Sequence, residues 1–405
     1  MSNSRSATIV LFTTVFIDLI GFGMIIPLIP YLGRELSHSP FKAGLLMAIY
    51  SLMQFIINPF WGQLSDKYGR RPILLLSLCG ASLSHLFFAF SSTFWMLFFA
   101  RMFAGVFGAN ISVAMAAMAD LSDAKGRSQK MGLIGAAFGL GFTLGPFFGG
   151  GLGYLGGYIS STAPFGVQTA ALGASLICML NFILGYFRLP ETLNPEARRP
   201  KSLSLEQRLT NIFLYFENPT INKLLAIYGM NTLAMALIEI SLFLFVKDRF
   251  DLDLIQASFG FAYIGLILVF TQGYLIRKLL PKYGERCLII FGLGLFIVGS
   301  AGIAFSFHIL VLGFFVSLLS LGQGLLSPAL TGSISLSESG EHQGQIMGVT
   351  QSLSALGRIL GPLGAGAIYK FSHIGPFLIS ASLAALAWIL FTFIQHNQKS
   401  TTPNP

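Results

Sequence analysis

Four charged side chains lie inside long apolar runs of the sequence: Asp18, Arg101, Glu239 and Arg358. A charge at the centre of a membrane helix costs about 2.5–3.5 kcal/mol on insertion scales, so each of the four suggests a functional role. Carboxyl groups in a low-dielectric site can bind and release protons near neutral pH. Asp18 and Glu239 are therefore candidate proton sites.

Each of these charges also has a structural interpretation. Asp18 could be a permanently hydrogen-bonded acid held by Gln54 or Asn58 of the next apolar run. Glu239 and Arg358 could form a buried ion pair, in which case removing either partner would be costly. The alternative for these two is a second proton site and an anion-binding site in a cavity.

The polar segment Gly62 to Pro72 separates two apolar runs, and part of it is repeated later in the chain. Asp66 and Arg70 are four residues apart and can pair if the segment is helical. Gly62 and Gly69 allow tight turns of the backbone. The segment could otherwise be an ordinary connection that carries positive charge.

The repeat has a period of about half the chain. Lys67-Tyr68-Gly69 returns as Lys282-Tyr283-Gly284, and Gly141-x3-Gly145-Pro146 returns as Gly357-x3-Gly361-Pro362. The second copy of the polar segment has no acid that corresponds to Asp66. The sequence therefore predicts a duplicated architecture whose polar segments differ between the halves.

Small residues follow one another at four-residue spacing in the fifth apolar run, at Gly141, Gly145 and Gly149. Such a stripe lets a neighbouring helix approach closely. Pro146 in the same run removes a backbone donor and is expected to bend the helix. Helix packing alone would also explain this pattern.

The composition places these residues in a membrane. Hydrophobic residues make up 54% of the 405 residues and charged residues only 10%, with a mean hydropathy of +0.73, whereas soluble domains have about 25% charged residues. Most of the 25 Lys and Arg residues fall on alternate connections, starting with the N-terminus. This asymmetry predicts cytoplasmic termini and argues against nucleic acid as the partner of this basic chain.

Runs of about 20 apolar residues can span a membrane as helices. We predict an all-α membrane protein with twelve such spans in two pseudo-symmetric six-helix bundles, at residues 1–188 and 223–405. The Pro-rich residues 189–222 are predicted to be a cytoplasmic linker. Apolar residues at helical spacing within it indicate an amphipathic surface helix, although a solvated loop is the alternative. The spans are expected at 7–32, 42–63, 73–91, 95–121, 130–155, 167–188, 223–246, 257–276, 287–305, 309–336, 344–369 and 375–396.

The segment Gly62 to Pro72 resembles the signature loop of the major facilitator superfamily, and Phe99-Ala-Arg101 and Gly145-Pro146 extend the resemblance. It is closest to the drug–proton antiporters with twelve spans, particularly the tetracycline efflux type. The resemblance implies the major facilitator fold, a role for Arg101 in proton transfer, and an antiporter motif in the glycine-rich fifth run. Arg101 could instead extend outward as an anchor.

The resemblance also implies that the polar segment is a latch that closes the cytoplasmic side. Asp120, at the end of the fourth run, is then the expected partner of Arg70. For Arg71, a specific role in the latch and a general preference for positive charge are equally good explanations. The predicted gate comprises Gly62, Asp66, Gly69, Arg70, Arg71 and Asp120.

Departures from the tetracycline exporters concern the substrate. Their third-span Asp is replaced by Ser84, with His85 beside it, and their eighth-span His by an apolar residue near Leu268. Those groups are associated in that family with a metal–tetracycline complex and its proton. Tetracycline itself is therefore in doubt as the substrate.

We predict a proton-coupled antiporter, not an enzyme, that exports small amphipathic compounds across the bacterial inner membrane by alternating access. A proton-driven importer of a siderophore or carboxylated metabolite is the alternative, and a non-transporting sensor is a third possibility. The expected partners are a small molecule, protons and the lipid bilayer, with a monomeric protein, no metal and no cofactor. The predicted substrate cavity comprises Asp18, Gln54, Asn58, Glu239, Gln323 and Arg358.

Overall fold

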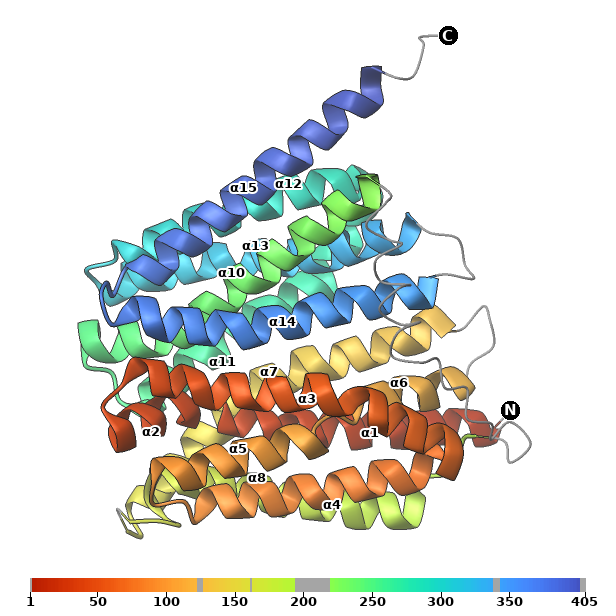
Figure 1. Ribbon diagram of the computed structural model, residues 1–405, viewed down its shortest axis with the longest axis vertical. Coiled ribbons are helices and arrows are strands. Elements are labelled where there is room, and N and C mark those ends of the chain that lie inside the picture. The colour runs from red at the N-terminus through yellow and green to blue at the C-terminus, as the bar shows by residue number, and fades with distance from the viewer. Residues whose placement is uncertain (1, 122–126, 161, 194–218, 338–342, 401–405) are drawn as a thin grey trace. The chain divides into compact units, whose positions relative to one another are not determined.

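The computed structural model describes residues 2–121, 127–160, 162–193, 219–337 and 343–400. Over these residues the chain is helical, without a β-strand (Figure 1). The N-terminal helices are α1 (Ser2–Ile25), α2 (Leu28–Ser37), α3 (Pro40–Tyr68), α4 (Arg70–Ala89), α5 (Phe94–Phe107), α6 (Ile111–Asp120), α7 (Arg127–Gly157), η1 (Gly166–Gln168) and α8 (Thr169–Arg188). The later helices are α10 (Pro219–Phe250), α11 (Leu254–Phe270), η3 (Thr271–Leu275), α12 (Ile276–Ala304), α13 (Ile309–Leu336), α14 (Gln343–Tyr369) and α15 (Gly375–Ser400).

The chain divides into two compact units. Unit 1 comprises residues 1–202 together with 246–265, and unit 2 comprises residues 203–245 together with 266–405. The main helices of each unit lie lengthwise beside one another (Figure 1). The amphipathic helix expected in the linker lies outside the described residues.

Within the described residues, nine helical segments are long and apolar enough to cross a membrane. One of them, Gln256–Ala304, is 49 residues long and covers two of the predicted spans. Helices α7 and α14 cover two further predicted spans. The described helices are therefore consistent with the prediction of twelve spans.

Two predicted spans are broken helices. The first is divided into α1 and α2 at Ile26 and Pro27, because proline cannot donate the backbone hydrogen bond that would continue α1. The fourth is divided into α5 and α6 by a turn at Gly108, Ala109 and Asn110. This second break contains the polar residue Asn110, in the middle of an otherwise apolar run.

The glycine stripe of α7 packs against α1. A Cβ atom added to Gly145 would lie 2.6 Å from the Cα atom of Gly23, and one added to Gly141 would lie 2.7 Å from Leu19 Cβ. In unit 2, Gly361 of α14 packs in the same way against Ala236 of α10, with 2.4 Å from an added Cβ to the alanine Cβ. The repeated glycines therefore mark a repeated helix contact.

The polar segment is shorter than the sequence suggests, because α3 continues to Tyr68 and α4 begins at Arg70. Gly69 alone makes the turn, with a φ of 104° that disfavours other residues. Gly284 at the repeated position has a φ of 71°. The turn predicted at Gly62 is wrong, since Gly62 lies within α3.

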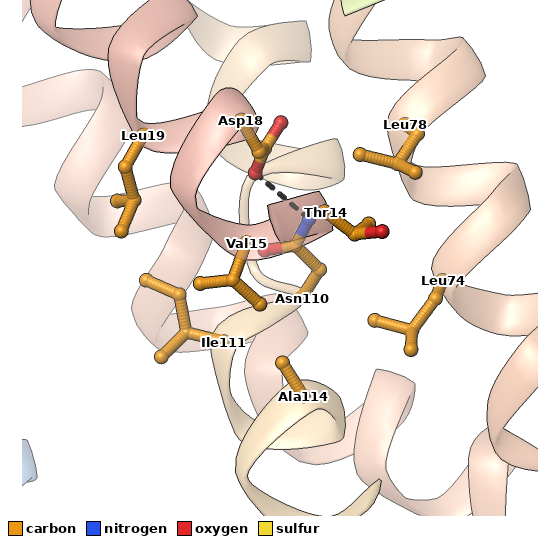
Figure 2. Close-up of a pocket in the computed structure, with 9 residues that line it drawn as sticks. All are labelled: Thr14, Val15, Asp18, Leu19, Leu74, Leu78, Asn110, Ile111 and Ala114. Carbon is orange, nitrogen blue, oxygen red and sulfur yellow. Dashed lines mark hydrogen bonds between the residues drawn. The ribbon is translucent and has the colours of Figure 1, made fainter. Parts of the chain in front are cut away.

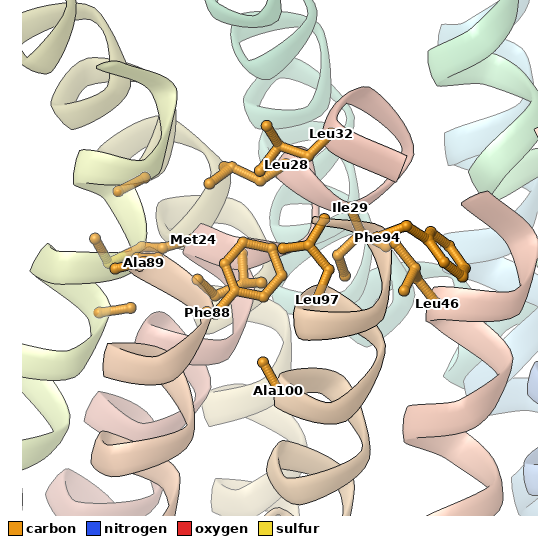
Figure 3. Close-up of a cluster of buried hydrophobic side chains, with 14 of the residues drawn as sticks. Met24, Leu28, Ile29, Leu32, Leu46, Phe88, Ala89, Phe94, Leu97 and Ala100 are labelled. Carbon is orange, nitrogen blue, oxygen red and sulfur yellow. The ribbon is translucent and has the colours of Figure 1, made fainter. Parts of the chain in front are cut away.

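Two clusters of buried apolar side chains fill unit 1. One lies around Met24, Leu28, Phe88 and Leu97 (Figure 3). The other lies nearer the Gly69 turn and includes Leu74. Together they hold α1 against α4, α5 and α6, the helices that position the polar residues described next.

Candidate functional site

Asp18 of α1 faces the break between α5 and α6. The side-chain amide of Asn110 donates a 3.1 Å hydrogen bond to the Asp18 carboxylate, and Figure 2 shows this pair among apolar side chains. Asn110 is at the N-terminus of α6, where the helix dipole favours a nearby negative charge. A carboxylate in this setting can be stabilised when charged and can still accept a proton.

The predicted partners of Asp18 were wrong. Gln54 donates instead to the Tyr50 hydroxyl at 2.9 Å and to the Gly108 carbonyl at 2.8 Å. Asn58 accepts a 2.5 Å hydrogen bond from the Ser112 hydroxyl. Both amides thus hold α3 against the α5–α6 break and do not reach Asp18.

Arg101 of α5 is buried, with 2% of its surface exposed. Its guanidinium lies 4.2 Å from the centre of the Tyr50 ring, and its Nε donates a 3.4 Å hydrogen bond to the Leu46 carbonyl. One terminal nitrogen, Nη1, has no hydrogen-bond partner. Arg101 therefore does not extend outward as an anchor, and it makes no hydrogen bond to Asp18.

The third-span residues Ser84 and His85 have different surroundings. The Ser84 hydroxyl donates to the Gly80 carbonyl of its own helix at 2.7 Å. His85 is buried and lies within electrostatic range of Arg101. His85 is thus coupled electrostatically to Arg101, whereas the Ser84 hydroxyl bonds within its own helix.

Arg70 lies at the α3–α4 turn, where the sequence predicts a latch. Its guanidinium contacts Asp66 at 2.6 Å and Asp120 at 3.1 Å, and it also donates to the Ser65 hydroxyl at 2.6 Å. The Arg70 side chain is 9% exposed, against 39% for Asp66 and 24% for Asp120. Both predicted pairings are confirmed. An ion pair whose guanidinium is buried and has several acceptors is stronger than an ion pair exposed to solvent.

Sequence reasoning missed a third acid beside this latch. Glu191, just after α8, accepts hydrogen bonds from the backbone N–H groups of Arg70 at 2.9 Å, Thr192 at 2.9 Å and Leu193 at 3.0 Å. The Thr192 hydroxyl also donates to Asp120 at 3.3 Å. Because Gly69 offers no side-chain cap to α4, Glu191 caps that helix from the start of the linker.

Arg71 lies next to the latch but has different partners. Its Nη2 donates a 2.6 Å hydrogen bond to the Tyr186 carbonyl, and its guanidinium lies 5.9 Å from the centre of the Tyr186 ring. These contacts join the start of α4 to the end of α8. Arg71 therefore contributes to the same helix junction without pairing with Asp66 or Asp120.

The charges of unit 2 do not form the buried ion pair that we considered. Glu239 of α10 is half-buried, whereas Arg358 of α14 is exposed. The two act on each other electrostatically, but no contact within 4.0 Å joins them in the described structure. Gln323 of α13 has a buried side-chain oxygen without a hydrogen-bond partner. The structure does not join Gln323 to the other two.

Comparisons with known proteins agree with this architecture. The family model of the major facilitator superfamily matches residues 11–362 and 282–405. The chain belongs to the major facilitator superfamily. It is therefore a multi-pass integral membrane protein of a transporter family.

Several relatives are similar over nearly their whole length. The class H tetracycline resistance protein of Pasteurella multocida is 34% identical over 403 residues, which cover 98% of each chain. The class B protein of Escherichia coli is 34% identical over 373 residues, covering 91% of this chain and 90% of that protein. Among solved structures, the human organic anion transporter MFSD10 (TETRAN) is 26% identical, with a TM-score of 0.73 and coverage of 96% and 99%.

A second solved structure supports the fold alone. A bacterial homologue of the human lysosomal transporter Spinster, in an inward-facing occupied conformation, is 13% identical with a TM-score of 0.80 and covers 98% of both chains. The resemblance to the superfamily and to its tetracycline-efflux members is therefore confirmed.

Proposed function

We propose that this protein is a proton-coupled antiporter that exports small amphipathic organic compounds. The observation that carries the proposal is the Asp18 carboxylate, held by Asn110 among apolar side chains of unit 1. A charged group at this depth is costly unless it has a function. The named relatives are tetracycline resistance proteins, which supports export of an organic compound.

Asp18 would accept a proton from one side of the membrane and release it to the other. Its protonation removes a negative charge beside the N-terminus of α6, so the proton changes the electrostatic balance between α1 and the broken fourth span. Arg101 and Glu239 are the further proton-coupling candidates. The buried Nη1 of Arg101 leaves a donor for a proton acceptor or a substrate atom.

The latch would hold one conformation of the alternating-access cycle. Arg70 binds two carboxylates and Glu191 binds the Arg70 backbone, so opening this end of the bundle requires several charge-assisted hydrogen bonds to break together. We place the latch on the cytoplasmic face of the bacterial inner membrane, with both termini on the same side. The transporter would work as a monomer and draw its energy from the proton gradient.

The direction of proton flux tests this proposal. Inside-out membrane vesicles are acidified by respiration, and a pH-sensitive dye reports the internal pH. Tetracycline with Mg²⁺, ethidium and fluorescein are then added outside as zwitterionic, cationic and anionic probes. An exporter releases internal protons when its substrate is added, and Asp18→Asn vesicles do not respond.

An importer gives the opposite pattern in the same vesicles. The external probe causes no alkalinisation, whereas a probe preloaded inside leaves together with protons. That result would replace the exporter with the proton-driven importer. A protein that moves no proton with any of the three probes would contradict the proposal for these substrate classes.

Organic anion transport is a second candidate, because Arg358 is an exposed guanidinium within a predicted span of unit 2. Guanidinium groups bind carboxylates in a bidentate manner. Glu239, within electrostatic range, would compete with an anion for Arg358 when it is ionised. The similarity to MFSD10, an organic anion transporter, supports this candidate. Among the probes above, a response to fluorescein that Arg358→Gln removes would favour it.

A further inference from the structure

A small pocket in unit 1 extends from Asp18 along α1. It is lined by Thr14, Asp18 and Asn110 together with apolar side chains that include Leu74 and Ala114 (Figure 2). About 10 Å³ is open to the centre of a water molecule, which is room for about one water. Apolar cavities stay dry, but this one has three polar groups on its wall, which is enough to hold a water.

Thr14 has a hydroxyl group that no other described residue uses. Its Oγ1 is buried without a hydrogen-bond partner, and 3% of the residue is exposed. Threonine in a helix usually donates to the carbonyl four residues earlier, as Thr13 does to Ile9 at 2.9 Å and Thr271 to Ile267 at 2.7 Å. Thr14 does not, and it lies one helical turn from Asp18 on the wall of the same pocket.

The pocket lies on the latch side of Asp18. Leu74 is four residues after Arg70, or about 6 Å along α4, and Ala114 is six residues before Asp120, or about 9 Å along α6. Between the pocket and the latch lies an apolar plug that belongs to one buried cluster. The plug comprises Leu11, Ile73, Ala117 and Met118.

We infer that Thr14 holds a water molecule against Asp18, and that this water carries the Asp18 proton toward the latch end of unit 1. The inference rests on the proposed function of Asp18. The carboxyl O–H bond breaks, the water oxygen accepts that proton, and the water passes one of its protons to the next water. Thr14 is a positioning residue, because it orients the water and does not itself gain or lose a net proton.

The apolar plug explains how the latch would control this route. Apolar side chains cannot carry a proton, so the pocket is isolated from that end of the bundle while the plug is closed. Helices α4 and α6 carry three of the four plug residues, with Leu11 on α1, and they also carry the two partners Arg70 and Asp120. Separating those partners would therefore move the plug and admit water to the pocket.

The test is the rate at which Asp18 loses its proton. Purified protein in lipid nanodiscs receives a rapid pH jump, and time-resolved infrared spectroscopy follows the carbonyl band of protonated Asp18, which is identified by its absence in Asp18→Asn. Thr14→Val keeps the shape but removes the hydroxyl, and we expect proton loss at least about tenfold slower. Thr14→Ser keeps a hydroxyl and should remain within about twofold of the wild-type rate.

A second variant fills the pocket without changing Thr14. Ala114→Val adds two methyl groups to the wall, displaces the water and should slow proton loss as Thr14→Val does. Wild-type rates in both variants would overturn the inference. A wild-type protein without any titrating Asp18 band would instead contradict the proposed function, so the two failures are distinguishable.

The unmutated protein gives an independent readout. On deprotonation of Asp18, the difference spectrum should contain an O–H band of an internal water that shifts when H₂¹⁸O replaces H₂¹⁶O. If Asp18 titrates without a band sensitive to ¹⁸O, no water is bound to it and the inference is wrong. This measurement decides the question even if a variant does not fold.

Discussion

Replacing Gly145 by alanine tests how tightly α7 packs on α1. The new Cβ would lie 2.6 Å from Gly23 Cα, 2.7 Å from Gly23 C and 3.0 Å from Ile20 O. Ordinary contact begins at 3.4 Å, so the closest approach is 0.8 Å too short. All three atoms belong to the backbone of α1, so no side-chain rotation can relieve the overlap and the two helices must separate.

Gly151 of the same helix is the matched control, because a Cβ added there meets nothing within 4 Å. Alanine gains about 1 kcal/mol of helix propensity over glycine at either position, so this gain cancels when the variants are compared. The remaining difference is the cost of overpacking, about 1–3 kcal/mol. Gly151→Ala should therefore be as stable as the wild type or more stable, and Gly145→Ala clearly less stable than Gly151→Ala.

The assay is thermal unfolding of the purified variants in one detergent, followed by the loss of helical circular dichroism. We expect the midpoint temperature of Gly145→Ala to lie below that of Gly151→Ala. Equal midpoints for the two variants would refute the close approach of α7 to α1. The assignment of the repeated glycines as helix contacts would then be wrong as well.

Three further predictions concern the latch, the buried arginine and the pH dependence of stability. Glu191→Ala removes the cap of α4 and should destabilise the protein by about 1 kcal/mol, whereas Glu191→Gln keeps a hydrogen-bond acceptor and should destabilise it less. Equal midpoint temperatures of thermal unfolding for the two variants would contradict the capping role. Arg101→Lys loses the planar group above Tyr50 and should abolish proton-coupled transport of the responsive probe while the protein still folds; unchanged transport would show that charge alone suffices. The hydrogen bond from Lys247 at 2.7 Å lowers the pKa of Asp251 from its usual 3.8, so this pair stabilises the protein at neutral pH, and that stabilisation is lost as the pH falls through the lowered pKa. The difference in midpoint temperature between wild type and Asp251→Asn should therefore vanish in strong acid. A difference that stays constant with pH would contradict this prediction.

The sequence was sufficient to predict the two ion pairs of Arg70, because the paired residues are close together or lie at the ends of apolar runs. Asp66 and Arg70 are four residues apart, and Asp120 stands where the fourth run ends. Glu191 was not predicted, because its contact with Arg70 joins segments 121 residues apart and nothing in the local pattern announces it. The conformational freedom of glycine suggested a turn at Gly62, but α3 continues through this residue to Tyr68.

The surroundings of Asp18 could be predicted only in part. Its depth in an apolar run identified it as a functional candidate, but the choice of Gln54 or Asn58 as its partner assumed that the fourth span is one straight helix. The break at Gly108 places Asn110 beside α1 instead. Gly108 and Asn110, two residues apart inside an apolar run, were the available signal for this break.

Coupling of protons to transport by Asp18 can be measured directly in proteoliposomes. Proteoliposomes with Asp18→Asn or wild-type protein are loaded with whichever probe releases protons in the vesicle assay, and two fluxes of that probe are measured. We expect Asp18→Asn to lose transport driven by a pH gradient but still to exchange internal for external probe without a gradient. Transport driven by the pH gradient at the wild-type rate in Asp18→Asn would contradict it.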